Sequence, residues 1–154
     1  MPVIVVGADT DLGGRIVDAL LPHASELRAF VTDGSVGASL RSRGVKVAVG
    51  DVSDASHVGG AALNTFCAVL VPEAAFDDRE RAFATSPGEV VRGWAAGLGE
   101  AGTRRAILID DDRIADAVQM IAGAAPEVVV VSTSGTAMAD VVAEVVRLEA
   151  LETI

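Results

Sequence analysis

Short, continuous runs of apolar residues recur along the chain and alternate with longer stretches whose apolar residues are spaced as on one face of a helix. Runs rich in Val and Ile are typical of strands that are buried on both faces of a parallel sheet. Helical stretches between successive strands indicate repeated βαβ units. Six strands are predicted, at Val3–Val6, Leu27–Thr32, Val45–Val49, Ala68–Val71, Ala106–Ile109 and Val128–Val131.

The segments between these strands predict helices, and local signals mark where some of them end. Pro22 stops the first helix, and Gly44 is suited to the left-handed residue that follows the second. The predicted helices are Leu12–Leu21, Val36–Arg43, a third from near Ser53 to Leu63, Pro87–Glu100, Asp112–Ala122 and Ala137–Glu152. We therefore expect an α/β fold with a single doubly wound parallel sheet in the order 3-2-1-4-5-6, forming one domain over residues 1–154.

Composition and charge exclude several classes of protein. The chain has 22 acidic against 12 basic residues and a formal net charge of -10, the wrong sign for binding nucleic acid phosphates or an anionic membrane. The single cysteine, Cys67, cannot form an internal disulfide, and no apolar run is long enough to span a bilayer. We expect a cytoplasmic protein with neither a nucleic acid nor a membrane as its partner.

The first predicted strand leads into Gly7-Ala8-Asp9-Thr10-Asp11-Leu12-Gly13 and then into a helix, the setting of a dinucleotide-binding loop. Such a loop needs glycine where the turn requires an unusual φ and where a diphosphate must approach the backbone. Gly7 and Gly13 suit the first and third glycine positions. Asp33, at the end of the second strand, is placed either to accept hydrogen bonds from an adenosine ribose or to act as a turn residue.

Together with Gly50-Asp51-Val52 after the third strand and Val71-Pro72 after the fourth, this loop resembles the atypical short-chain dehydrogenase/reductases, especially the NmrA-like NAD(P)-binding family. The resemblance covers the first half of the chain by motif and the rest by strand order. It implies that the loop wraps the pyrophosphate, that the second strand's end selects between NAD and NADP, and that an aspartate lies beside the adenine. The implied cofactor-binding residues are Gly7, Asp9, Thr10, Asp11, Leu12, Gly13, Thr32, Asp33, Asp51, Val52 and Pro72.

The chain departs from the family pattern at three places. Thr10 replaces the middle glycine and adds a Cβ where a phosphate would press. Asp9 and Asp11 add negative charge, and two like charges about 4 to 8 Å apart repel by roughly 2–4 kcal/mol at an effective dielectric near 20. An exposed helix N-terminus offers a phosphate only about 0.3–1 kcal/mol, so binding requires both carboxylates to point away. Thr32 stands where the family commonly has an arginine suited to the ribose 2′-phosphate of NADP. The loss of that arginine favours NAD over NADP.

Standard dehydrogenase chemistry is not expected. The chain contains no tyrosine, which excludes the Tyr-x-x-x-Lys pair of mainstream short-chain dehydrogenases, and its only lysine, Lys46, lies on the third strand. Asp110-Asp111-Asp112 stand where such enzymes place a catalytic serine. This run is either a site for a cation or hydroxyl groups or a solvated helix start, and we assign no catalytic residue and no metal site.

Three functions remain open. The first is a minimal NAD(P)-binding Rossmann protein, either a nucleotide sensor or a relative that has lost catalysis. The second is a structural or interaction subunit that binds no nucleotide, and the third is an NAD(P)H-dependent reductase that takes its acid from Asp110 or water. We also expect a homodimer or a place in a larger assembly, with two apolar stripes as candidate contacts: Val90, Trp94 and Leu98, or Val141, Val145 and Leu148.

Overall fold

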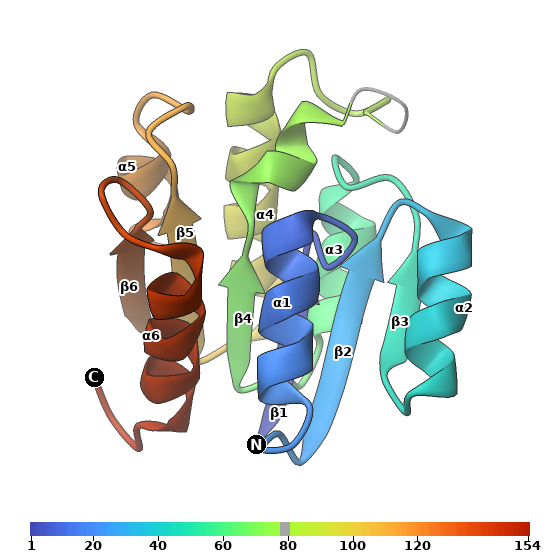
Figure 1. Cartoon of the computed structure of the whole chain (residues 1–154). Helices are drawn as coiled ribbons and strands as arrows, with labels where there is room; N and C mark the ends of the chain where they lie inside the picture. Colours follow the sequence, from blue (N-terminus) through green and yellow to red (C-terminus); the bar gives the residue numbers. More distant parts are fainter. Residues whose placement is uncertain (78–80) are drawn as a thin grey trace.

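The computed structural model describes residues 1–77 and 81–154 and contains one six-stranded sheet in which every neighbouring pair of strands is parallel. The order β3-β2-β1-β4-β5-β6 confirms the predicted fold class and topology (Figure 1). Each strand boundary differs from the prediction by at most one residue. The strands are β1 (Pro2–Val6), β2 (Glu26–Val31), β3 (Lys46–Val49), β4 (Cys67–Leu70), β5 (Arg105–Asp110) and β6 (Glu127–Ser132).

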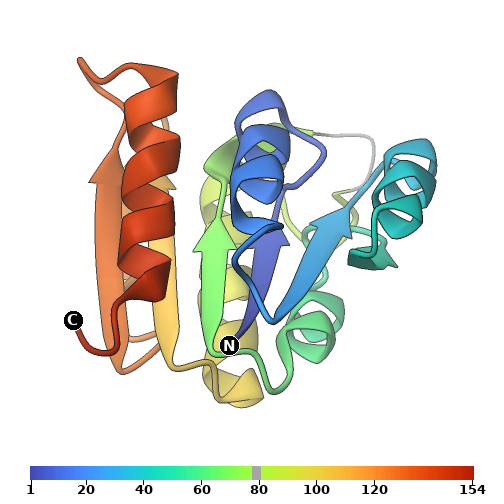
Figure 2. The same cartoon turned by 60° about the horizontal axis from the view of Figure 1, so that its bottom comes forward.

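Helices cover both faces of the sheet, with α1, α2 and α6 on one face and α3, α4 and α5 on the other (Figures 1 and 2). The short 3-10 helix η1 follows β4 at the carboxyl end of the sheet. No helix among the described residues is both long and apolar enough to cross a membrane. The helices are α1 (Asp11–Leu20), α2 (Gly34–Ser42), α3 (Ala55–Ala62), η1 (Pro72–Phe76), α4 (Pro87–Ala101), α5 (Ala117–Ile121) and α6 (Met138–Ala150).

Each helical layer forms its own core against the sheet. Alternate residues of the central strand β1 point to opposite layers, so Val3 and Val5 pack in one core and Ile4 and Val6 in the other. Burial on both faces explains why β1 reads as an unbroken apolar run. The two stripes considered above as dimer contacts lie inside these cores, where Val90, Trp94, Leu98, Val141, Val145 and Leu148 are at most 5% exposed. Neither stripe is therefore available for a subunit contact.

The segment after β5 differs from the prediction, because the helix expected over Asp112–Ala122 begins only at Ala117. Asp112 and Asp116 have φ angles of 65° and 60°, the left-handed conformation that a right-handed helix cannot include. The amide of Asp112 donates to Asp110 Oδ1, so an aspartate side chain competes with the helix for the backbone donor.

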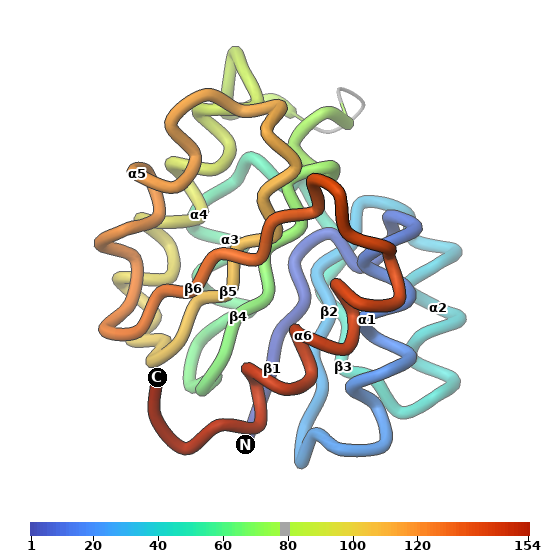
Figure 3. The backbone as a smooth tube through the Cα atoms, turned by 60° about the vertical axis from the view of Figure 1, so that its left-hand side comes forward, coloured from blue at the N-terminus to red at the C-terminus, as the bar shows by residue number. Residues whose placement is uncertain are grey.

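Buried Arg105 fastens the C-terminal helix to the sheet. Its Nη1 donates to the carbonyls of Leu148, Glu149 and Leu151 at 2.8, 3.1 and 2.7 Å, and its Nε donates to Glu127 Oε2 at 2.8 Å. These bonds satisfy carbonyls that the end of α6 leaves without a helical partner. Both chain termini lie at the amino end of the strands, opposite to the loops described next (Figure 3).

Candidate functional site

The direction of the strand order changes between β1 and β4, and loops from both strands meet there at the carboxyl end of the sheet. A hollow of about 410 Å³, called here the switch-point crevice, opens between these loops. Ligands of doubly wound sheets bind in crevices at this position. The crevice is lined by Asp9, Thr10, Asp11, Thr32, Glu73, Ala74, Phe76, Asp77 and Arg113.

The loop after β1 turns sharply at Gly7. Gly7 has a φ of +88°, and the amide of Thr10 donates to the Gly7 carbonyl at 3.1 Å to close a tight turn. A Cβ on Gly7 would lie 2.9 Å from Ala74 Cβ and 3.0 Å from the carbonyl oxygen of Val71. Glycine is therefore required here both for the backbone conformation and for contact with the segment that follows β4.

Gly13 allows α1 to approach the end of β1. A Cβ on Gly13 would lie 1.9 Å from the Gly7 carbonyl oxygen, a distance that excludes any side chain. The assignment of Gly13 to the third glycine position, where helix and strand pack closely, is consistent with this geometry. Neighbouring Leu12 is 9% exposed and packs into the core beneath the loop.

Thr10 caps α1 with its side chain. Thr10 Oγ1 donates to the Gly7 carbonyl at 2.7 Å and accepts from the amide of Gly13 at 3.0 Å. The Thr10 hydroxyl thus acts as the N-cap of α1 at the position where the family has a glycine. In doing so it occupies one of the amides that an anion at the helix start would use. Within the described part of the chain, the amides of Asp11 and Leu12 have no hydrogen-bond partner.

The two aspartates of the loop have different surroundings. Asp9 Oδ2 accepts from the backbone amides of Thr32 and Asp33, at 2.8 and 3.1 Å, at the end of β2. Asp11 extends into solvent with its side chain 69% exposed, and its Oδ1 lies 3.4 Å from Arg15 Nε. The Asp9 carboxylate is therefore stabilised by backbone donors, whereas water screens the charge of Asp11.

Asp33 is the N-cap of α2. Its Oδ1 accepts from the amide and the hydroxyl of Ser35, at 2.8 and 2.7 Å, and from the amide of Val36 at 3.4 Å. Asp33 thus has a local role as a helix cap. Contact with a ribose remains a prediction for this residue.

Asp51 binds a segment far along the chain. Its Oδ1 accepts from the amide and hydroxyl of Ser53, at 2.8 and 2.6 Å, and its Oδ2 accepts from the amide of Ala82 at 2.8 Å. Burial raises the pKa of Asp51, but these hydrogen bonds outweigh it and leave the pKa below its ordinary value. Ser53 Oγ accepts in turn from the amide of Phe83 at 3.0 Å. The Asp51 side chain, which the resemblance places beside the adenine, is therefore engaged by the segment at residues 82–83.

Val52 and Pro72 are both buried. Val52 is 2% exposed, and its carbonyl accepts from Trp94 Nε1 at 2.9 Å. Pro72 is buried at the first turn of η1, where the missing N–H of proline has no cost. Of the residues proposed from the sequence, Asp9, Thr10, Asp11 and Thr32 line the crevice. The others lie outside its lining: Gly7, Leu12, Gly13, Asp33, Asp51, Val52 and Pro72.

Sequence reasoning missed the residues that line the crevice from η1 and from the loop after β5. The Arg113 guanidinium stacks 4.2 Å from the ring centroid of Phe76 and is paired with Asp111, whose Oδ2 lies 2.7 Å from Arg113 Nη2. Glu73 and Asp77 add further carboxylates. The rule that ligands bind outside the carboxyl ends of the strands is a signal that would have indicated both loops.

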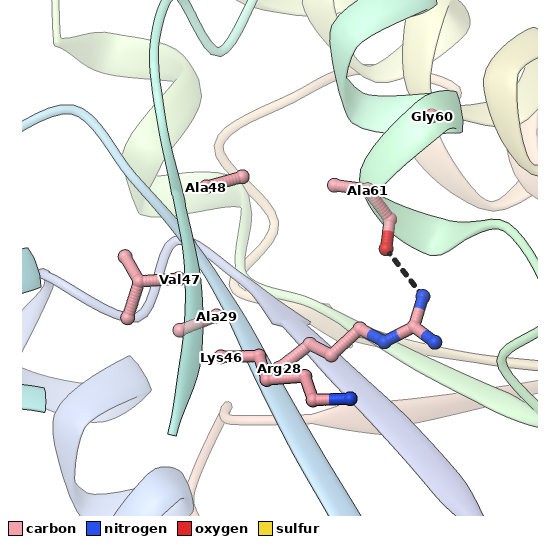
Figure 4. Close-up of a pocket in the computed structure, with 7 residues that line it drawn as sticks. All are labelled: Arg28, Ala29, Lys46, Val47, Ala48, Gly60 and Ala61. Carbon is pink, nitrogen blue, oxygen red and sulfur yellow. Dashed lines mark hydrogen bonds between the residues drawn. The ribbon is translucent and has the colours of Figure 1, made fainter. Parts of the chain in front are cut away.

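A second hollow, of about 230 Å³, lies beside the edge strand β3 (Figure 4). Arg28 Nη1 donates to the carbonyls of Ala61 and Leu63 at the end of α3, and Glu26 bridges Arg28 and Lys46. The positive groups of this hollow are thus already engaged by the protein. Cys67 is buried, and burial raises the pKa of its thiol to about 12, as is typical of an unreactive core cysteine.

No protein-family model and no curated protein matches the chain. Solved structures match its fold. The NADPH complex of an NADPH-dependent quinone oxidoreductase from Escherichia coli is 16% identical with a TM-score of 0.66, over 79% of this chain and 45% of that one. A nucleoside-diphosphate-sugar epimerase from Staphylococcus aureus is 16% identical with a TM-score of 0.68, over 86% and 50%.

The triphenylmethane reductase of Citrobacter sp., in complex with NADP(H), is 17% identical with a TM-score of 0.62, over 80% of this chain and 44% of that one. The chain thus spans about half the length of these structures. At such low identities the likeness establishes a shared Rossmann-like fold and leaves the function to be argued from the site.

Proposed function

We propose that this protein binds a dinucleotide of the NAD type in the switch-point crevice and acts as a nucleotide sensor or as a relative that has lost catalysis. The observation that carries the proposal is the close approach of α1 to β1, where a Cβ on Gly13 would lie 1.9 Å from the Gly7 carbonyl oxygen. This approach aims the start of a helix at the place where dinucleotide-binding folds hold a pyrophosphate. Similar solved structures bind NADPH or NADP(H), which supports the same class of ligand.

The pyrophosphate would be held by backbone donors. The amides of Asp11 and Leu12 have no partner within the described part of the chain and lie at the start of α1, where the helix dipole favours an anion. Arg113, the cationic residue in the crevice lining, would add a guanidinium from the opposite loop by exchanging its pairing with Asp111 for one with a phosphate. This donor set fits a diphosphate provided that Asp9 keeps its bonds to Thr32 and Asp33.

The charges at the end of β2 favour NAD over NADP. The carboxylates of Asp9 and Asp33 both lie at this strand end, and Asp9 already occupies the amides of Thr32 and Asp33. A 2′-phosphate here would meet like charge, at a cost of roughly 2–4 kcal/mol per unit-charge pair at an effective dielectric near 20. The ribose 2′-hydroxyl of NAD is a donor and avoids this cost.

A bound dinucleotide would supply hydride-transfer chemistry, but this chain lacks the acid pair that short-chain dehydrogenases use. It contains no tyrosine, and Lys46 lies on the edge strand β3. Asp110, the acid of the reductase alternative, already accepts the amide of Asp112 at 3.1 Å. We therefore favour binding without turnover, and retain the reductase as the alternative that a turnover assay would reveal.

A structural subunit that binds no nucleotide is the second candidate. It is favoured by Thr10, whose hydroxyl occupies the Gly13 amide, and by the acidic lining of the crevice, where Asp9, Asp11, Glu73 and Asp77 face one arginine. The two candidates differ in one property, the affinity for a dinucleotide.

Isothermal titration calorimetry with NAD and NADP separates the candidates. We expect saturable binding of NAD and, for NADP, a dissociation constant at least about tenfold larger, which corresponds to 1.4 kcal/mol. Asp9→Asn should reduce the difference between the dissociation constants for NAD and NADP. Asp18→Asn, which makes the same charge change at an exposed residue paired with Arg43, should leave it unchanged. An absence of heat for both nucleotides at millimolar concentration would overturn the proposal in favour of the structural subunit.

A further inference from the structure

The two edges of the sheet are protected to different degrees. The edge strand β3 has four residues, begins with Lys46, and has its Val47 carbonyl bonded to Arg41 Nη2 at 3.1 Å. Strand β6 is longer and has the sequence Glu-Val-Val-Val-Val-Ser, without proline, glycine or lysine. Figure 2 shows β6 at the margin of the sheet. Short length and a lysine are common protections of an edge strand, and β6 lacks both.

The ladder with β5 determines which groups of β6 are free. The amide of Glu127 donates to the Arg104 carbonyl and that of Thr133 to the Asp110 carbonyl, so the odd-numbered residues bond to β5. Backbone groups alternate in direction along a strand. The amides and carbonyls of Val128, Val130 and Ser132 therefore point away from β5, and within the described part of the chain no hydrogen bond reaches them. We call these three residues the β6 edge.

Two of the three residues of the β6 edge are valines, and none of the three is charged. Val130 is 37% exposed, and Val118 on the short helix α5 is 39% exposed. The charged residue of β6, Glu127, is neutralised within the chain, because its carboxylate oxygens lie 2.8 Å from Arg105 Nη2 and 3.6 Å from Arg104 Nη2. Pairing along this edge would thus bury valine side chains without burying an unpaired charge.

We propose that the β6 edge binds the same edge of a second copy of this chain, in an antiparallel pair whose two-fold axis passes through Val130. Val130 would then face Val130 of the second copy, and Val128 would face Ser132 in both directions. The outward groups of these residues match the hydrogen-bonded pairs of an antiparallel ladder, in which two opposite residues exchange both bonds. The two sheets would join into one continuous sheet.

The proposed register avoids like-charge contacts as well as matching hydrogen-bond donors to acceptors. In this register Glu127 lies opposite Thr133 and Val129 opposite Val131, so no two like charges face each other across the pair. The other edge is protected by Lys46 and Arg41, so the association closes at two copies and does not continue into a filament. Both helical stripes that sequence reasoning offered as dimer contacts are buried, which leaves this edge as the surface we assign.

Sedimentation velocity with Val130→Pro tests the proposal. Because the Val130 amide points away from β5, proline removes the donor of the free edge and leaves the β5 ladder intact. We expect the wild-type chain to sediment at twice its 15.6 kDa mass and Val130→Pro to have a dimer dissociation constant at least about tenfold larger. Val130→Thr, which keeps both the amide and a β-branched side chain, is the matched control and should remain a dimer. A wild-type monomer, or a dimer insensitive to Val130→Pro, overturns the proposal.

Hydrogen exchange provides a second measurement that does not need a variant. The amides of Val128, Val130 and Ser132 should be protected at concentrations where the dimer forms and should exchange rapidly on dilution to the monomer. The amides of Val129 and Val131 should be protected in both states, because they belong to the β5 ladder. Protection of all three edge amides in a particle of monomer mass would mean that another segment of the same chain covers the edge, which contradicts the proposal.

Discussion

Asp9 Oδ2 lies 2.8 Å from the backbone nitrogen of Thr32, so a side chain of the loop after β1 holds the end of the neighbouring strand. A second bond, from the amide of Asp33 at 3.1 Å, completes the arrangement. Two backbone donors stabilise the negative charge of Asp9 and hold its carboxylate at the end of β2. The acidic loop is thus compatible with an anionic ligand only in this conformation.

Replacing Asp9 by alanine should destabilise the fold. The substitution leaves two amides at the end of β2 without their charged acceptor, and hydrogen bonds to charged groups contribute about 1.5–3 kcal/mol. We expect a loss of this size in the free energy of unfolding, measured by urea denaturation, and a smaller loss for Asp9→Asn, which retains an acceptor oxygen. Asp11→Ala is the control and should change stability by less than about 0.5 kcal/mol, because this side chain is 69% exposed. Equal losses for Asp9→Ala and Asp11→Ala would contradict the account.

Thr10→Gly should strengthen dinucleotide binding. It removes the hydroxyl that occupies the Gly13 amide and the Cβ that faces the phosphate position, and glycine is a good N-cap, so stability should fall by only a few tenths of a kcal/mol. We expect the dissociation constant for NAD in calorimetry to decrease by about threefold or more, the equivalent of a modest hydrogen bond. Thr10→Ser keeps the hydroxyl and should bind as the wild type does. Tighter binding by Thr10→Ser than by Thr10→Gly would show that the hydroxyl does not compete with the ligand.

Two adjacent glycines of α3 should respond in opposite ways to alanine. A Cβ on Gly59 would lie 2.9 Å from the Gly97 carbonyl oxygen of α4, whereas a Cβ on Gly60 meets nothing within 4 Å. Gly59→Ala should lower the free energy of unfolding by about 1–3 kcal/mol through overpacking. Gly60→Ala should raise it by about 0.5–1 kcal/mol, because alanine loses less backbone entropy in a helix. Thermal or urea denaturation of the two variants measures both changes in the free energy of unfolding. Stabilisation by Gly59→Ala would contradict the packing described for α3 and α4.

Acid should weaken the contact between Asp51 and residues 82–83. Hydrogen bonds from Ser53 and Ala82 leave the pKa of Asp51 below its ordinary value of 3.8 despite burial. A carboxyl whose pKa is lower in the folded state adds stability above its unfolded pKa, and this contribution is lost as the pH falls through the folded pKa. Asp51→Asn should therefore be less stable than the wild type at neutral pH, and the difference should shrink below about pH 4. A difference that stays constant from neutral pH to acid would contradict this role for the charge.

Much of the fold is predictable from local sequence. The apolar runs at β1 and β4 are buried on both faces, and Gly44 has the left-handed φ of +87° expected where α2 ends. Helix α5 was predicted too long, because aspartates after β5 bond to nearby amides in turns that periodicity does not detect.

The site was only partly predictable. Gly7, Thr10 and Gly13 form a local motif whose geometry follows from its spacing. In contrast, the bonds from Thr32 to Asp9 and from Ala82 to Asp51 join residues far apart in the sequence. No periodicity or spacing rule specifies such tertiary contacts, and the first of them decides where the Asp9 carboxylate of the crevice points.

Titration of NAD into uniformly ¹⁵N-labelled protein shows whether a dinucleotide binds at the switch point with its pyrophosphate on α1. We predict saturable chemical-shift changes concentrated at the amides of Asp11, Leu12 and Thr32, with Lys46 and its neighbours at the second hollow unaffected. Saturable changes confined to the second hollow, or no changes at millimolar NAD, would contradict the account.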